Sequence, residues 1–139
     1  MTTRCVFCSI IEGETSAEVV ASTEHVVAFL DHVPLFPGHV LVVPRRHVPT
    51  LTDLADAEVA PLFTAVREIA RAVSIALDAP GTFVANNNVV SQSVPHLHVH
   101  VVPRRRGDGL RGFFWPRQRY VDATQRREVA ASIARHLSL

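Results

Sequence analysis

The sequence predicts a single α+β domain, residues 1–139, built on a mainly antiparallel sheet. Four apolar, β-branched segments have strand character, whereas only one long segment has helical periodicity. These segments follow one another as strands, one long helix, further strands and a short helix, without the strand–helix–strand alternation that is typical of parallel sheets. A chain of 139 residues with 47% hydrophobic content is long enough for one core.

The first part of the sheet is predicted from two strands joined by a turn. The segment HVVAFLD (25–31) is apolar and rich in β-branched residues, and HVLVVPR (39–45) has the same character. Pro37 and Gly38 lie between them and form a turn signal. We therefore expect a hairpin-like pair of adjacent strands.

Two segments have helical character. Residues 57–78 place apolar side chains at three- and four-residue spacings, with Asp56 as the candidate N-cap and Pro80 just beyond the end. Near the C-terminus, Asp122 and Gln125 resemble a capping box that begins a short last helix. The apolar positions of this helix, which fall on one face, are Val129, Ile133 and Leu137.

The remaining strands are predicted at 82–86 (TFVAN) and 96–104 (HLHVHVVPR), on either side of a polar loop at 87–95. Side chains alternate between the faces of a strand, so His96, His98 and His100 share one face. Neighbouring histidine Cα atoms are then about 7 Å apart. The apolar residues between and after the histidines, Leu97, Val99 and Val101, can pack against a helix on the other face.

Three histidines on one strand face allow three interpretations. Two of them could bind a metal together with a ligand from another element. The row could instead be catalytic, because neutral imidazole is a good nucleophile toward phosphorus and Ser91, Gln92 and Ser93 offer hydrogen-bond donors just before it. The histidines could also be polar residues on an exposed sheet face. The spacing alone leaves these interpretations open.

Composition and charge narrow the class of protein. A net charge of +1 gives no overall field that would attract nucleic acid or membrane. No segment approaches the roughly 18 apolar residues of a membrane span, and the N-terminus lacks the features of a signal peptide. We therefore expect a cytoplasmic protein with no nucleic-acid or membrane partner. Clustered arginines allow a local anion site or a solvated basic face; they are Arg45, Arg46, Arg104, Arg105, Arg106, Arg111, Arg117 and Arg119.

The two cysteines form a C-x-x-C pair, Cys5 and Cys8. In a reducing compartment such a pair favours thiolate ligands for a metal over a structural disulfide. Two thiolates supply half of a tetrahedral zinc site, so two further ligands have to come from elsewhere in the chain. A redox pair and two unconnected buried thiols are the alternatives.

Several of these motifs together resemble the histidine triad (HIT) family. The matching segments are FLDHVPLFPGHVLVVPRRH, QSVPHLHVHVVPR and the pair Trp115-Pro116, and they span roughly residues 5–120. The resemblance implies a HIT-like fold, with a mainly antiparallel five-stranded sheet, one long helix and a short C-terminal helix. It also implies a homodimer, because family members pair to extend their sheets.

The resemblance implies catalytic roles for the triad and for the residues before it. His98 corresponds to the nucleophile that attacks the α-phosphate of a nucleotide and forms a nucleotidyl-histidine intermediate. His100 corresponds to a contact of the α-phosphate or the departing group, and Gln92 and Ser93 to further contacts of the same groups. Many relatives carry glycine at the position of Ser91.

A nucleotide-binding set is also implied by the resemblance. Asp31 would hold the ribose hydroxyls, Phe29 and His32 would line the base pocket, and His39 would lie near the phosphate. One asparagine of residues 86–88 would orient the phosphate or the ribose. The complete set is Phe29, Asp31, His32, His39, Asn86 or Asn87, Ser93, His98 and His100.

Bacterial members of the family often carry a C-x-x-C pair in a structural zinc site. The other two ligands are then a histidine just after the second strand and the first triad histidine. In this chain the implied zinc ligands are Cys5, Cys8, His47 and His96.

The implied activity is that of a nucleotide hydrolase or transferase acting on the α-phosphate of nucleotide conjugates. The expected substrates are purine nucleoside phosphoramidates or dinucleoside polyphosphates. A nucleotide-binding protein without catalysis is one alternative. A metal-dependent hydrolase that uses His96 and His98 is another.

Overall fold

Five antiparallel strands form the sheet in the computed structural model, which describes residues 4–111 and 117–139. The strands are β1 (Val19–Ser22), β2 (Val26–Leu30), β3 (Val40–Pro44), β4 (Gly81–Ala85) and β5 (Val99–Arg104). Their order across the sheet is β1-β2-β3-β5-β4, and every neighbouring pair is antiparallel. The predicted α+β class and five-stranded sheet are confirmed.

The chain divides into two compact units, Met1–Asp108 and Gly109–Leu139. The first unit contains the whole sheet, the helices α1 (Val6–Ile11) and α2 (Asp56–Ala76) and a 3-10 turn at Leu51–Asp53. The Trp115-Pro116 pair falls outside the described residues. The single-domain organisation over 1–139 stays a prediction.

The triad strand is shorter than predicted, because it begins at Val99 rather than at residue 96. The partner strand β3 ends at Pro44, which has no backbone N–H to donate to a ladder. The N–H of Leu97 instead donates to the carbonyl oxygen of Val48, at 2.7 Å. His96 and His98 therefore lie just before the strand, and only His100 belongs to it.

The long helix α2 occupies the predicted segment, but its N-cap is Ala55 and not Asp56. The Glu58 carboxylate reaches back and accepts from the Ala55 N–H at 3.2 Å. Asp56 lies in the first turn, where a negative charge is favoured by the helix dipole. The side-chain hydrogen bond that we expected from Asp56 at the start of the helix is thus made by Glu58.

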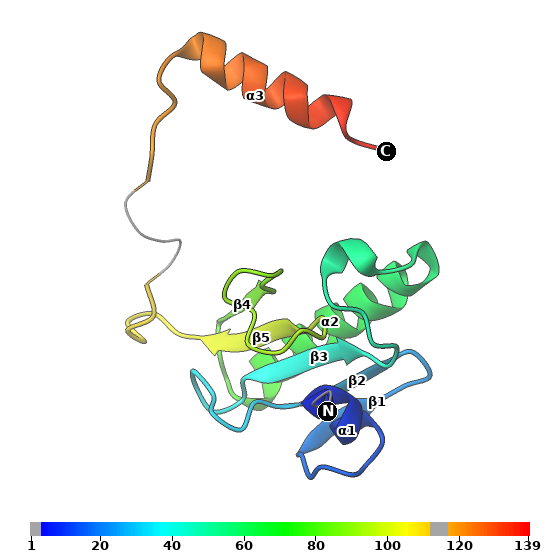
Figure 1. Cartoon of the computed structure of the whole chain (residues 1–139). Helices are drawn as coiled ribbons and strands as arrows, with labels where there is room; N and C mark the ends of the chain where they lie inside the picture. The colour runs from blue at the N-terminus through cyan, green and yellow to red at the C-terminus, as the bar shows by residue number, and fades with distance from the viewer. Residues whose placement is uncertain (1–3, 112–116) are drawn as a thin grey trace. The chain divides into compact units, whose positions relative to one another are not determined.

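Apolar side chains cover both faces of the sheet, and α1 and α2 lie on opposite sides of it (Figure 1). Leu97, Val99 and Val101 pack toward α2, as the alternation predicted. The second cluster lies on the α1 side and consists of Phe7, Val27, Phe29, Leu41 and Val43. Because Leu41 pairs with His100 across the ladder, this second face is the face of the triad.

The second unit contains α3 (Ala123–Arg135). Asp122 caps it as predicted, since its Oδ1 accepts from the N–H of Gln125 at 2.7 Å. The reciprocal bond of the predicted capping box differs, because Gln125 Oε1 accepts from the N–H of Val121 and not from that of Asp122. No residue within α3 is buried, and Val129 and Ile133 are exposed.

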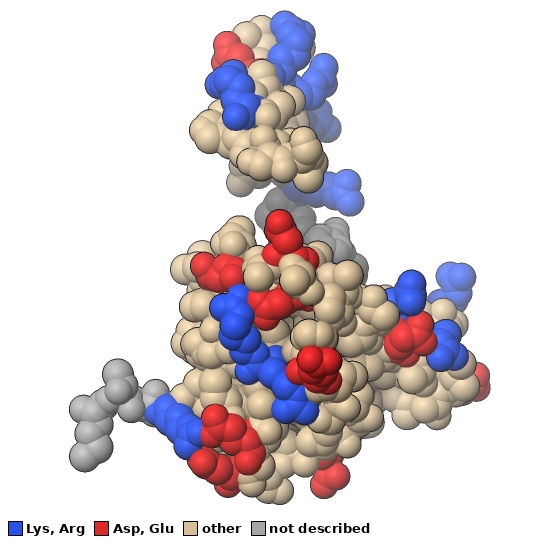
Figure 2. Space-filling model, turned by 90° about the vertical axis from the view of Figure 1, so that its right-hand side faces the viewer, with Lys and Arg blue, Asp and Glu red and all other residues tan. Residues whose placement is uncertain are grey.

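Several arginines of the predicted basic clusters have specific partners in the first unit. Arg46 pairs with Glu58, Arg104 pairs with Asp108, and Arg45 donates to the carbonyl oxygen of Thr23. On the face drawn in Figure 2, basic and acidic side chains of this unit lie beside one another. In the part of the chain that the structure describes, no helix has both the length and the apolar character to cross a bilayer.

Candidate active site and metal centre

The triad histidines lie on the sheet face opposite α2. His96 and His98 are buried, with exposed fractions of 0% and 3%, and His100 is half-buried. The ring centroids of His98 and His100 are 5.0 Å apart. The interpretation of these residues as polar side chains on an exposed sheet face is therefore wrong.

One hydrogen bond fixes the tautomer of His98. Its Nδ1 lies 2.7 Å from the carbonyl oxygen of His96. A carbonyl oxygen only accepts, so Nδ1 carries the proton and donates it. In the neutral ring the lone pair is then on Nε2, which is the form that an imidazole nucleophile requires.

A second chain of hydrogen bonds fixes the tautomer of His100. The Leu35 N–H donates to His39 Nδ1 at 3.1 Å, so the proton of a neutral His39 is on Nε2. His39 Nε2 lies 2.9 Å from His100 Nδ1 and donates to it. The proton of a neutral His100 is consequently on Nε2. His98 Nε2 thus offers a lone pair, whereas His100 Nε2 offers an N–H donor.

Burial keeps His39 and His100 neutral near physiological pH. It is the main cause that lowers the pKa of His100 to about 4; His98 and His39 act in the same direction, and Asp31 opposes them. Burial also lowers the pKa of His39, with Asp31 again opposing and His98 adding to the effect.

The depressed pKa of His100 predicts a loss of stability in mild acid. A histidine of the unfolded chain has a pKa of about 6.5, so between that value and about 4 the unfolded state binds more protons than the folded state. The contribution of His100 is complete above pH 6.5 and declines as the pH falls toward 4. Urea unfolding at pH 7 and pH 5 measures the loss, which should be smaller in His100→Asn. Equal losses in both proteins would contradict this assignment.

Asp31 lies directly after β2, beside His39. Its Oδ2 is 3.8 Å from His39 Nε2, and its Oδ1 accepts from the Val33 N–H at 3.0 Å. The predicted base-pocket residues around it are placed differently, since the Phe29 side chain is buried and that of His32 is 96% exposed. In this arrangement Asp31 is held in place, whereas the exposed His32 side chain has its Nδ1 3.9 Å from Asp31 Oδ1.

Asp31, His39 and His100 also place three ligand atoms within 4.8 Å of one another. The hydrogen bonds disfavour a metal there. Because His39 Nδ1 accepts from Leu35, His39 Nε2 carries a proton and has no lone pair for an ion. This group is better suited to proton donation than to metal binding.

Both ends of the Gln92 side-chain amide are hydrogen-bonded to other residues of the protein. Its Nε2 donates to the Pro49 carbonyl oxygen at 2.6 Å, and its Oε1 accepts from the Val89 N–H at 2.9 Å. The Nε2 end therefore holds the loop before the triad against the segment after β3, and the Oε1 end stabilises the loop itself. Ser93 is exposed.

The asparagines of this loop hold its shape. Asn86 Nδ2 donates to Asn88 Oδ1 at 2.9 Å, and the same oxygen accepts from the Leu51 N–H at 2.8 Å. Asn87 Nδ2 donates to the Ser91 carbonyl oxygen at 3.1 Å. Ser91 has a φ of 61°, a left-handed conformation that favours glycine.

Cys5, Cys8, His47 and His96 come together with their ligand atoms within 4.8 Å of one another. The Nδ1 atoms of His47 and His96 are 3.2 Å apart, and Cys8 Sγ lies 3.4 Å and 3.6 Å from them. Cys5 Sγ is 3.5 Å from His96 Nδ1. Bond lengths of about 2.0–2.3 Å to a tetrahedral zinc ion give ligand separations of roughly 3.3–3.8 Å, so the spacing fits.

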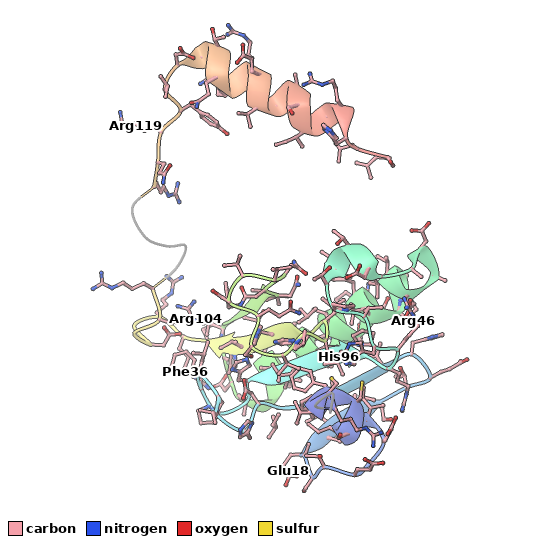
Figure 3. The ribbon with its side chains drawn as sticks, in the orientation of Figure 1. Glu18, Phe36, Arg46, His96, Arg104 and Arg119 are labelled. Carbon is pink, nitrogen blue, oxygen red and sulfur yellow. The ribbon has the colours of Figure 1, made fainter. Side chains whose placement is uncertain are left out.

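The protonation of His96 also fits a metal. Its Nε2 lies 2.9 Å from the Pro44 carbonyl oxygen and donates to it, so the lone pair is on Nδ1, within the cluster. Burial raises the pKa of the Cys8 thiol, so a thiolate there requires a nearby cation. His96 lies above α1 with sulfur atoms beside it (Figure 3).

Comparison with known proteins agrees with this geometry. A family model of the HIT domain matches residues 12–107. The chain belongs to the HIT family.

Solved HIT structures share the fold. A HIT family protein of Bacillus subtilis superposes with a TM-score of 0.89 at 35% identity, covering 99% of each chain. A zinc-bound histidine triad protein of Mycobacterium smegmatis has a TM-score of 0.72 at 36% identity, covering 94% of each chain. The asymmetrical bis(5'-nucleosyl)-tetraphosphatase of Schizosaccharomyces pombe is 39% identical over 70 residues, which are 49% of this chain and 38% of that protein.

Sequence reasoning missed one residue of this HIT site, Phe7, which packs against the rings of His96 and His98. The position of Phe7 between the two cysteines was a usable signal, because a C-x-x-C turn that meets the triad brings its middle residues there as well. Asn88 was one of the three candidate asparagines, and its side chain joins the loop to the segment after β3.

Proposed function

We propose that this HIT protein is a nucleotide hydrolase or transferase that acts at the α-phosphate of nucleotide conjugates. The observation that carries the proposal is the complementary pair of tautomers, with a lone pair on His98 Nε2 beside a proton on His100 Nε2. A relationship to the tetraphosphatase of Schizosaccharomyces pombe supports the same class of reaction.

In the proposed reaction, His98 Nε2 attacks the α-phosphorus and forms a phosphorus–nitrogen bond. The bond from phosphorus to the departing amine or phosphate breaks, and the leaving group takes the electron pair. His100 Nε2–H donates to the phosphoryl oxygen or to the leaving group as negative charge develops. Water then attacks the nucleotidyl-histidine, which releases the nucleotide and restores His98.

The residues before the triad have a supporting role in this scheme. Gln92, Asn86 and Asn87 shape the loop beside the phosphate site, and Ser93 is free to turn its hydroxyl toward the substrate. Phe29 and His32 would line a base pocket if His32 closes over a purine.

The test is single-turnover labelling with substrates that carry the label on the α-phosphate. Adenosine phosphoramidate, diadenosine polyphosphates and adenylyl sulfate form the panel. We expect at least one of them to leave label covalently attached to protein after an acid-free denaturing quench. Nucleotide binding without covalent label or product would instead support a binding protein without catalysis.

The metal-hydrolase alternative uses His96 and His98 as ligands of a catalytic ion. It is disfavoured because His98 Nδ1 donates to the His96 carbonyl oxygen and His96 Nδ1 faces the cysteines. A chelator would stop the chemistry of such an enzyme at once, while the proposed HIT mechanism would continue for as long as the fold persists.

We also propose a nucleotide-binding role for Asp31, which predicts weaker binding of AMP by Asp31→Ala. The loss of charge-assisted hydrogen bonds to the ribose hydroxyls should cost about 1–3 kcal/mol. Calorimetry with AMP measures the loss, and a 2',3'-dideoxy analogue serves as the control ligand because it should bind both proteins alike. Equal affinities of both proteins for AMP would exclude the ribose role.

We propose that the cluster of Cys5, Cys8, His47 and His96 binds structural zinc. The donor set, the ligand spacing and the orientation of His96 support this, and so does the zinc-bound relative from Mycobacterium smegmatis. When bound, the ion would hold α1 and the chain before β5 together. The reduced thiols that it needs agree with a cytoplasmic location, which we propose as well.

A homodimer is a further proposal, and it predicts twice the chain mass in solution. β4 lies at the edge of the sheet, its residue Val84 is 42% exposed, and Val59 and Phe63 are exposed on α2. A second copy could pair with this edge and cover these apolar residues. Light scattering at micromolar concentration measures the mass, and a monomer would refute the proposal.

A further inference from the structure

Phe7 connects the metal cluster with the triad. It is the second residue between Cys5 and Cys8, it belongs to α1, and its side chain is only 6% exposed. Its ring centroid lies 5.1 Å from that of His98, with the planes at 81°, and 5.9 Å from that of His96, with the planes at 72°. A ring at this place contacts both the candidate nucleophile and a candidate metal ligand.

The His98 side chain needs more than its hydrogen bond to be held in one orientation. The bond from Nδ1 to the His96 carbonyl oxygen fixes one atom of the ring, but leaves the ring free to tilt about that atom. Phe7 meets the imidazole at 81°, and the ring of His100 meets it at 68° with a centroid distance of 5.0 Å. These contacts restrict the plane of the ring and, with it, the direction of the Nε2 lone pair.

We propose that Phe7 is a positioning residue for His98, an inference that rests on the proposed role of His98 as the nucleophile. Perpendicular aromatic contacts depend on orientation, whereas aliphatic contacts fill space without a preferred angle. Phe7 itself is held by Phe29, at 5.4 Å and 64°, and by its place between the two cysteines. The C-x-x-C turn therefore sets the orientation of the nucleophile as well as contributing two thiolates.

The test compares Phe7→Leu with Val27→Ala. Val27 belongs to the same apolar cluster and is 3% exposed, so its truncation is a control for lost packing. Nitrogen-15 NMR of the imidazoles reports the tautomer of His98, whose signals are assigned by their absence from His98→Gly. Single-turnover labelling reports the rate of nucleotidyl transfer, and metal content and AMP affinity are measured on the same samples.

In Phe7→Leu we expect His98 to populate both tautomers and the labelling rate to fall about tenfold, with AMP affinity within roughly threefold of wild type. Val27→Ala should keep the single Nδ1–H tautomer and the wild-type rate. If Phe7→Leu fails to fold or to hold metal, the same measurements are made on Phe7→Met, which retains more of the apolar volume.

The positioning role is overturned if Phe7→Leu keeps the wild-type tautomer and rate. It is equally overturned if Val27→Ala matches the effect of Phe7→Leu, because loss of packing would then be sufficient. If wild-type protein forms no covalent intermediate, the proposed function fails, and the tautomer of His98 alone decides the role of Phe7.

Discussion

Replacement of His98 by glycine should abolish turnover while AMP still binds. The substitution removes the nucleophile and its covalent intermediate together, so we expect the rate to fall by about 10⁴-fold or more. AMP affinity should persist, because the ribose contact proposed for Asp31 is independent of His98. Steady-state hydrolysis of the best panel substrate and calorimetry with AMP measure the two effects.

A matched control for this prediction is His25→Gly. His25 is also a histidine, but its side chain is 52% exposed and its Nε2 lies 4.0 Å from Glu24 Oε2. The control should retain wild-type turnover. Turnover by His98→Gly within tenfold of wild type, in a preparation free of contaminating hydrolase, would show that another group is the nucleophile.

Loss of one zinc ligand should lower stability much more than activity at moderate temperature. Removal of a thiolate from a closed four-ligand site releases the ion, and metal binding contributes directly to the free energy of folding. For Cys5→Ser, Cys8→Ser and His96→Ala we expect the melting temperature to fall by roughly 10 °C or more. Activity should fall far less than in His98→Gly, since no ligand of the cluster is a reacting group.

Elemental analysis and thermal unfolding with and without a chelator test this prediction. Wild-type protein should contain one zinc ion per chain and have a lower melting temperature with the chelator. The melting temperature of Cys5→Ser should be the same with and without the chelator. Wild-type protein without zinc, or Cys5→Ser with full zinc occupancy, would show that the assignment of these four residues as zinc ligands is wrong. His96 would then return to the row of catalytic candidates.

The sequence predicted the long helix and four strands because these features have strong local patterns, whereas the roles of the histidines were implied by the resemblance to the HIT family. The helix has 21 residues with a buried stripe, and the alternation of Leu97, Val99 and Val101 with histidines survives in the packing. β1 and α1 were missed, since four and six residues are too few for periodicity to appear. β1 is also an edge strand whose apolar residues are mostly exposed, so no alternation of apolar and polar residues marks it.

The hydrogen-bond partners within the site could not be predicted, because they join segments that are distant in the chain. The side-chain amide of Gln92 is a suitable donor to a phosphate, yet it donates to the carbonyl oxygen of Pro49, 43 residues away. The tautomer of His100 depends in the same way on His39, 61 residues earlier. A sequence pattern identifies side chains that could act in catalysis, whereas the tertiary structure determines which nitrogen of each histidine carries the proton.

The spacing of the metal ligands has a consequence for synthesis of the chain. Cys5 and His96 are separated by 91 positions, so at about 5–20 residues per second a ribosome needs roughly 5 to 20 seconds to produce the last ligand after the first. By then β1 to β4 have already been made, and only β5 and α3 are still to come. If all four proposed ligands hold a metal ion, that ion would therefore close the fold late and would not nucleate it, and the two thiols would have to stay reduced on the nascent chain until it binds.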